Sequence, residues 1–79
     1  MTINWREEGG ALHARHVLDP RTMYLAMVMQ AHQGEWYAII ILAQTGKRSK
    51  FRGESRSQCV EWVTAYIDEQ SNTTERRQS

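Results

Sequence analysis

Apolar residues alternate with polar ones over residues 11–18, form two strongly apolar segments over 23–31 and 35–43, and change to a helical spacing after Gly53. Alternation with a period of two is typical of β-strands. The predicted strands lie around Trp5 and over residues 11–18, 23–31, 35–43 and 47–52. Gly9-Gly10, Asp19-Pro20 and His32-Gln33-Gly34 provide turn residues between them, and the last of these is the strongest hairpin signal. The pattern predicts an antiparallel meander.

The helical period follows Gly53. The apolar residues at spacings of three and four are Cys59, Trp62, Val63, Tyr66 and Ile67. Ser55 is a suitable N-cap, and Gln58 stands three residues later, as in a capping box where each side chain binds the other residue's backbone amide. The predicted fold class is therefore α+β: an antiparallel meander sheet of three to five strands with one C-terminal amphipathic helix packed on one face.

The central hairpin is apolar on both sides. Trp36, Ala38, Ile40 and Leu42 share one side of the strand, and Tyr37, Ile39, Ile41 and Ala43 share the other. In a sheet with one solvated face, apolar and polar residues normally alternate along each strand. Because both sides of this hairpin are apolar, the second face also needs a cover. The N-terminal segment around Trp5, a twin subunit and a binding partner all remain open. Tyr37, Ile39, Ile41 and Trp5 are the candidate residues of an apolar binding face.

Length and charge set the domain organisation. Seventy-nine residues allow one core, and we predict a single domain over residues 1–69 with a disordered polar tail over 70–79. The net charge is only +1, yet half of the ten basic residues lie between positions 47 and 56. These are Lys47, Arg48, Lys50, Arg52 and Arg56. Such a basic edge could follow a phosphate backbone, or it could only protect a sheet edge from unwanted pairing.

Other classes of protein are disfavoured. The start of the chain has no basic and apolar segments of a secretory signal, so a cytoplasmic location is expected, and the apolar run 36–43 is too short to span a membrane. His13, His16, His32 and Cys59 do not have the spacing of a metal site. We expect no metal, no cofactor and no small-molecule substrate. No nucleophile with a base and an orienting group can be assigned, so no catalytic residue is expected and the chain should not be an enzyme.

Some segments resemble known families. Trp36-Tyr37, Gly46-Lys47-Arg48 and the run 55–62 resemble the arm-binding N-terminal domain of tyrosine recombinases, a three-stranded sheet plus helix that reads DNA with its sheet. Gly53 stands where that family usually has an aromatic residue, and Cys59 where it has alanine. Gly53 and Ser55 also resemble the end of double-stranded RNA-binding domains, but the first helix and the paired lysines of that family are missing.

In size and layout the whole chain resembles small proteins encoded by phages and prophages, with a hairpin at residues 34–37 and a Ser55-capped final helix. Some of these proteins, including anti-CRISPR inhibitors, occupy a site on a host complex. The leading hypothesis is a non-enzymatic protein-interaction module, a phage-derived inhibitor that binds a host or defence complex or its own twin as a homodimer. The alternative is a nucleic-acid-binding domain that uses strand 47–52 and the helix start.

Overall fold

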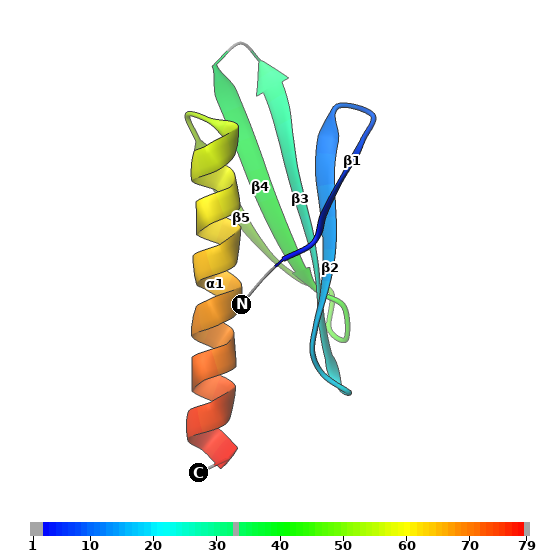
Figure 1. Ribbon diagram of the computed structural model, residues 1–79, viewed down its shortest axis with the longest axis vertical. Helices are drawn as coiled ribbons and strands as arrows, with labels where there is room; N and C mark the ends of the chain where they lie inside the picture. Colours follow the sequence, from blue (N-terminus) through cyan, green and yellow to red (C-terminus); the bar gives the residue numbers. More distant parts are fainter. Residues whose placement is uncertain (1–2, 33, 79) are drawn as a thin grey trace.

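A computed structural model describes residues 3–32 and 34–78, with side chains described for 3–31 and 34–72. The described residues form five strands followed by one helix (Figure 1). They are β1 (Trp5–Glu8), β2 (Ala11–Asp19), β3 (Thr22–His32), β4 (Glu35–Leu42), β5 (Lys47–Gly53) and α1 (Arg56–Gln78). The α+β class, with a five-stranded antiparallel sheet and one C-terminal helix, is confirmed.

The sheet is a simple meander in the order β1-β2-β3-β4-β5. Its turns depend on glycine where φ is positive, as at Gly34, where φ is 75°, and Gly46, where φ is 74°. Gln33, the middle of the predicted β3–β4 turn, lies outside the described residues. Because successive side chains of a strand point to opposite sides, each face of the sheet is built from alternate residues of neighbouring strands.

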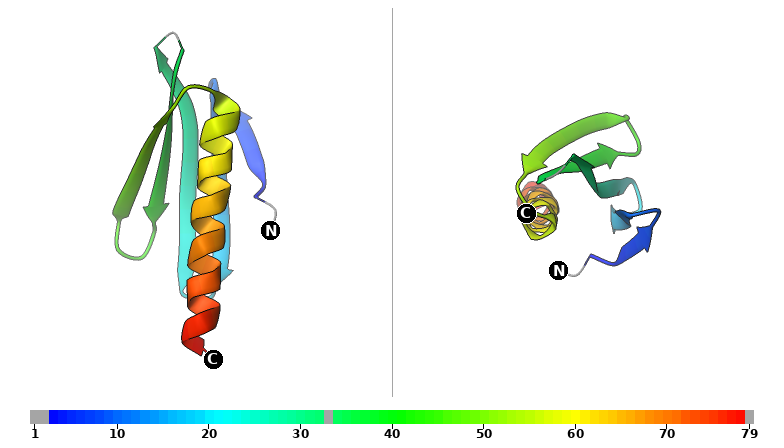
Figure 2. Two further views of the ribbon diagram at one scale, coloured as in Figure 1. Left: turned by 90° about the vertical axis from the view of Figure 1, so that its left-hand side faces the viewer. Right: turned by 90° about the horizontal axis from the view of Figure 1, so that it is seen from above.

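The core lies between one face of the sheet and α1, which packs against β3, β4 and β5 (Figure 2). Its buried side chains are Ala14, Tyr24, Ala26, Val28, Ala38, Ile40, Cys59, Val63 and Ile67. An aromatic series crosses the same interface: Phe51 stacks on Trp62 at 5.2 Å between ring centroids, and Tyr66 lies 5.6 Å from Trp62 and 6.4 Å from Tyr24. The Tyr66 hydroxyl also hydrogen-bonds the Ser49 hydroxyl at 3.0 Å, so both hydroxyl groups have a hydrogen-bond partner within the apolar layer.

The N-terminal end of α1 is capped as the sequence predicts, with one difference. The Gln58 amide donates to Ser55 Oγ at 3.1 Å. The return bond goes one residue further back, because Gln58 Oε1 accepts from the Glu54 amide at 2.7 Å instead of from the amide of Ser55. Gly53 is buried where the chain turns from β5 into this helix, and a methyl group there would meet Cys59 Sγ at 3.0 Å. The helix therefore starts directly against the sheet.

The C-terminal end of α1 extends past the strands (Figures 1 and 2). The sequence predicts that the domain ends near residue 69, whereas the helical backbone continues to Gln78. Residues 70–78 contain no apolar side chain that could bury against the sheet. The disorder of the 70–79 tail stays a prediction, and Ser79 lies outside the described residues. Within the described part of the chain, α1 lacks an apolar stretch long enough to cross a membrane.

Candidate functional site

The side of the sheet opposite α1, here called the open face, carries the alternate residues of every strand. On β3 and β4 these are Leu25, Met27, Met29, Tyr37, Ile39 and Ile41, which we call the apolar stripe. Leu25 and Met29 are 39% and 37% exposed, and the other four side chains are half-buried against their neighbours. None of the described elements of the chain packs over the stripe, so apolar atoms of the two inner strands meet solvent.

Basic residues flank the stripe on both sides. Strand register places Arg15, Leu25, Ile41 and Arg48 in one row across β2, β3, β4 and β5. The next row on the same face consists of Arg6, His13, Met27, Ile39 and Lys50, because Arg6 of β1 pairs with His13. Each row therefore begins and ends with a basic residue and has two apolar residues between them. We call Arg15 with His13 the β2 rim, and Arg48 with Lys50 the β5 rim.

The open face is hollowed from the β5 rim across the β2 rim as far as β1. A depression of about 770 Å³ is lined by the residues of both rows, together with Asn4 and with Arg6 and Glu8 of β1. Three strand spacings separate the β2 rim from the β5 rim, which corresponds to about 14 Å.

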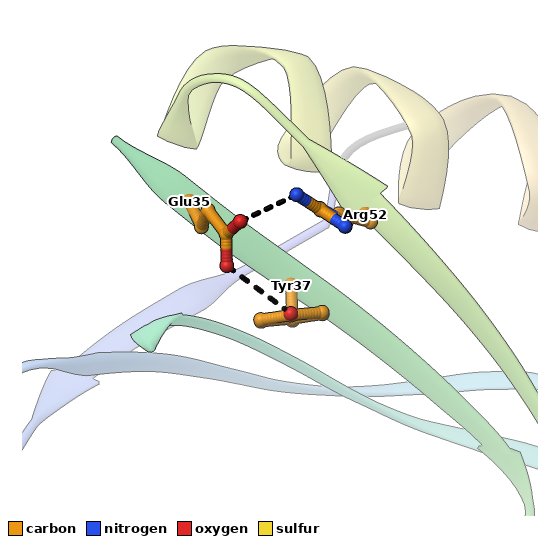
Figure 3. A network of polar contacts seen from close by, with 3 residues as sticks. All are labelled: Glu35, Tyr37 and Arg52. Carbon is orange, nitrogen blue, oxygen red and sulfur yellow. Dashed lines mark hydrogen bonds and ion pairs between the residues drawn. The ribbon is translucent and has the colours of Figure 1, made fainter. Parts of the chain in front are cut away.

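Ion pairs neutralise the ends of the face but not its centre. Glu35 accepts from Arg52 and lies 3.4 Å from the Tyr37 hydroxyl, which donates to it (Figure 3). On β1, Arg6 lies 3.6 Å from Glu8. Among the described side chains, Arg15, Arg48 and Lys50 form no ion pair. Arg15 on the β2 rim and Arg48 and Lys50 on the β5 rim therefore keep their positive charge for an external group.

The structure separates some of the residues that the sequence proposes together. Tyr37, Ile39 and Ile41 share the open face, but Trp5 pairs with the buried Ala14 and packs on the helix side. The first strand joins the sheet as an edge strand and does not fold over the open face. The N-terminal segment is thus removed from the possible covers of this face.

The basic edge is divided in the same way. Arg48, Lys50 and Arg52 lie on the open face, whereas Lys47 takes the helix side of β5 and Arg56 belongs to α1. Arg15 and His13 were not among the site residues that the sequence proposes. Their alternation within 11–18 puts them on one side of a strand, but only the pairing of β2 with β3 shows which face that is.

Cys59, Tyr24 and His16 lie away from the open face. Cys59 is fully buried beneath the helix start, and burial raises the pKa of its thiol, opposed by a hydrogen bond with the backbone of Gly53. Burial also raises the pKa of Tyr24, with Tyr66 and Asp19 adding to the shift. His13 is exposed on the open face, and His16 is half-buried on the helix side. No three His, Cys, Asp or Glu side chains gather as a metal site in the described part of the chain.

Comparison with known proteins finds no matching family model, no matching curated protein and no matching solved structure.

Proposed function

We propose that the chain is a non-enzymatic protein-binding module and that its open face holds the partner. The observation that carries this proposal is the apolar stripe on β3 and β4, the two strands that α1 covers only from the other side. A solvated sheet face normally alternates with polar residues. Contiguous exposed apolar residues rimmed by polar groups are typical of interaction surfaces.

The lining of the depression supports binding over catalysis. Its described residues offer apolar side chains, basic groups, the Asn4 amide and the Glu8 carboxylate, without a hydroxyl or thiol nucleophile. Glu8 is already paired with Arg6. A small domain that presents one preformed face fits an inhibitor that occupies a site on a larger complex, the role that the resemblance to small phage proteins implies.

Affinity capture with matched variants tests this proposal. The tagged chain, a Met27→Ser/Ile39→Ser variant and an Ala65→Ser control are each exposed to a lysate of the cells in which the chain is made. Ala65 is exposed on α1, which lies on the side of the sheet opposite the stripe. We expect a partner that the wild type and the control retain and the double variant loses. Equal capture by all three chains, or a monomer by light scattering that captures nothing, contradicts the proposal.

Nucleic-acid binding is the second candidate, because Arg48 and Lys50 are unpaired and lie about 6.8 Å apart along β5. A basic row of this kind can follow successive phosphates. The test is a fluorescence titration with single-stranded and duplex oligonucleotides at about 50 mM salt. Binding that weakens steeply as salt rises and is lost in Arg48→Gln/Lys50→Gln supports this candidate, and absence of binding removes it.

A further inference from the structure

We propose that the partner of the open face is an acidic amphipathic α-helix that lies along β3 and β4 between the two rims. This inference rests on the proposed function, because it names the chemistry of the partner that the same face would bind. Three properties of the face support it: the width between the rims, the spacing of the charges within each rim, and the aliphatic character of the stripe.

The width fits one helix. The β2 rim and the β5 rim are separated by three strand spacings, about 14 Å. An α-helix with its side chains is about 10–12 Å across. A helix laid along the stripe would therefore fill the space between the rims, with its two edges beside Arg15 and Arg48. A second sheet would extend beyond both rims and bring its own strands over the basic side chains.

The spacing along each rim also fits. Arg48 and Lys50 are two residues apart on one strand, so their Cα atoms are about 6.8 Å apart. Carboxylates at i and i+4 on one edge of a helix are about 6 Å apart along its axis. Two Glu residues at that spacing could meet Arg48 and Lys50 together, and a second pair on the other edge could meet Arg15 and His13. An apolar i, i+3, i+4, i+7 face would then contact the stripe.

The floor of the site favours a protein over a nucleic acid. Five of the six residues in the stripe are aliphatic or Met, and the single aromatic, Tyr37, already donates to Glu35. Protein surfaces that bind single-stranded nucleic acids stack the bases on several aromatic rings. Methionine side chains are flexible and polarisable, and they suit grooves that receive apolar helix faces. A nucleic acid whose phosphates contact the rims would place polar groups against this aliphatic floor.

The charges also disfavour a twin subunit in the same place. Two copies that meet open face to open face would bring four basic rims together, and Arg15, Arg48 and Lys50 form no ion pair that could neutralise them among the described side chains. An acidic helix instead supplies the opposite charge to both rims at once. Charge complementarity of this kind selects partners and orients them.

Three synthetic peptides of equal length test the inference. All have Leu at i, i+3, i+4 and i+7, and the positions on both edges are Glu in the first, Lys in the second and Gln in the third. Binding to the wild-type chain is measured by fluorescence anisotropy at two salt concentrations. We expect the Glu peptide to bind at least about tenfold more tightly than the Lys peptide, with a difference that shrinks as salt rises.

Two charge-reversal variants locate the effect. Arg48→Glu/Lys50→Glu changes the β5 rim, and Lys47→Glu/Arg56→Glu makes the same change in net charge on the helix side. The rim variant should lose the Glu peptide and gain affinity for the Lys peptide, and the control variant should behave as the wild type. Circular dichroism checks that both variants fold, and Arg48→Gln/Lys50→Gln replaces the rim variant if it does not.

Each outcome decides the inference. No binding of the Glu peptide, or equal binding of all three peptides, overturns it. Oligonucleotide binding that depends on Arg48 and Lys50 and displaces the peptide overturns it in favour of nucleic acid, and a dimer that the Glu peptide does not dissociate overturns it in favour of a twin. If capture still depends on Met27 and Ile39 in these cases, the proposed function stands and only the acidic helix is wrong.

Discussion

Ile39 and Ile40 are adjacent residues of the same type on opposite faces of β4, and this makes them a direct test of the two-faced sheet. Ile40 is 1% exposed between the sheet and α1, whereas Ile39 is half-buried on the open face. Replacing each by alanine removes the same atoms from two different environments. The free energy of unfolding should therefore fall by very different amounts.

The magnitudes follow from burial. Truncation of a fully buried Ile to Ala costs about 2–5 kcal/mol because it loses burial and leaves a cavity. For Ile39, three carbon groups at about 0.8 kcal/mol each, roughly half removed from water, give about 1.2 kcal/mol. A domain of this size loses about 4–8 °C in Tm for each kcal/mol. Ile40→Ala should thus lower Tm by about 8 °C or more and Ile39→Ala by about 5–10 °C.

Urea denaturation at low protein concentration, followed by tryptophan fluorescence and by circular dichroism, measures both variants. Ile40→Val, which costs only about 0.5–1.5 kcal/mol, keeps a folded comparison if Ile40→Ala is largely unfolded. Partner or peptide binding should show the reverse order, with Ile39→Ala weakened and Ile40→Val unchanged. Equal loss of stability for Ile39→Ala and Ile40→Ala in the dilute, isolated chain would refute the reasoning, because it would mean that the open face is covered without a partner.

Three further changes test the helix start. Gly53→Ala should cost about 1–3 kcal/mol, since its methyl group meets Cys59 Sγ, Gln58 Oε1 and Phe51 Cε2, each at 3.0 Å. Cys59→Ala removes one of these three contacts and should restore part of the loss in a double-mutant cycle; additive effects would contradict the close contact with Cys59. Ser55→Ala removes the acceptor of the Gln58 amide and should cost about 1 kcal/mol in thermal melts, while the exposed Ser57→Ala stays within about 0.5 kcal/mol of the wild type. Burial raises the pKa of Cys59 above its ordinary value of 9.0, so the folded state holds the thiol proton more tightly than the unfolded state. Stability from this group is complete below that value and is lost as pH rises above it; urea melts from pH 7 to 10 should show a shallower decline in Cys59→Ala.

Much of the fold is readable from local sequence. The period-two segments, the glycine and proline turns and the change to a helical period after Gly53 place every element, and Ser55 places the helix start. The extent of α1 is the main difference, since residues 70–78 offer no apolar side chain yet continue the helix. From Trp36 on, odd-numbered and even-numbered residues of β4 are both apolar, which also indicates that the face left open by the helix needs a cover of its own.

The candidate site is less readable because it is assembled across strands. Tyr37, Ile39 and Ile41 follow from alternation alone, but Trp5 was expected beside them and lies on the opposite face. Arg15 and Arg48 are 33 positions apart and meet in one row only through two intervening strands. The pattern of residues within one segment cannot show which residues of distant strands lie in the same row of the sheet.

By itself, the sequence determined the elements, their order and the presence of two apolar sides in the central hairpin, because side-chain periodicity, turn residues and capping act over a few neighbouring positions. Only the tertiary structure decided which side α1 covers and which basic residues border the other side. Register between strands sets both, since each side chain's face and row depend on hydrogen bonds to a neighbouring strand. The open face, with its rims on β2 and β5, is a product of that register.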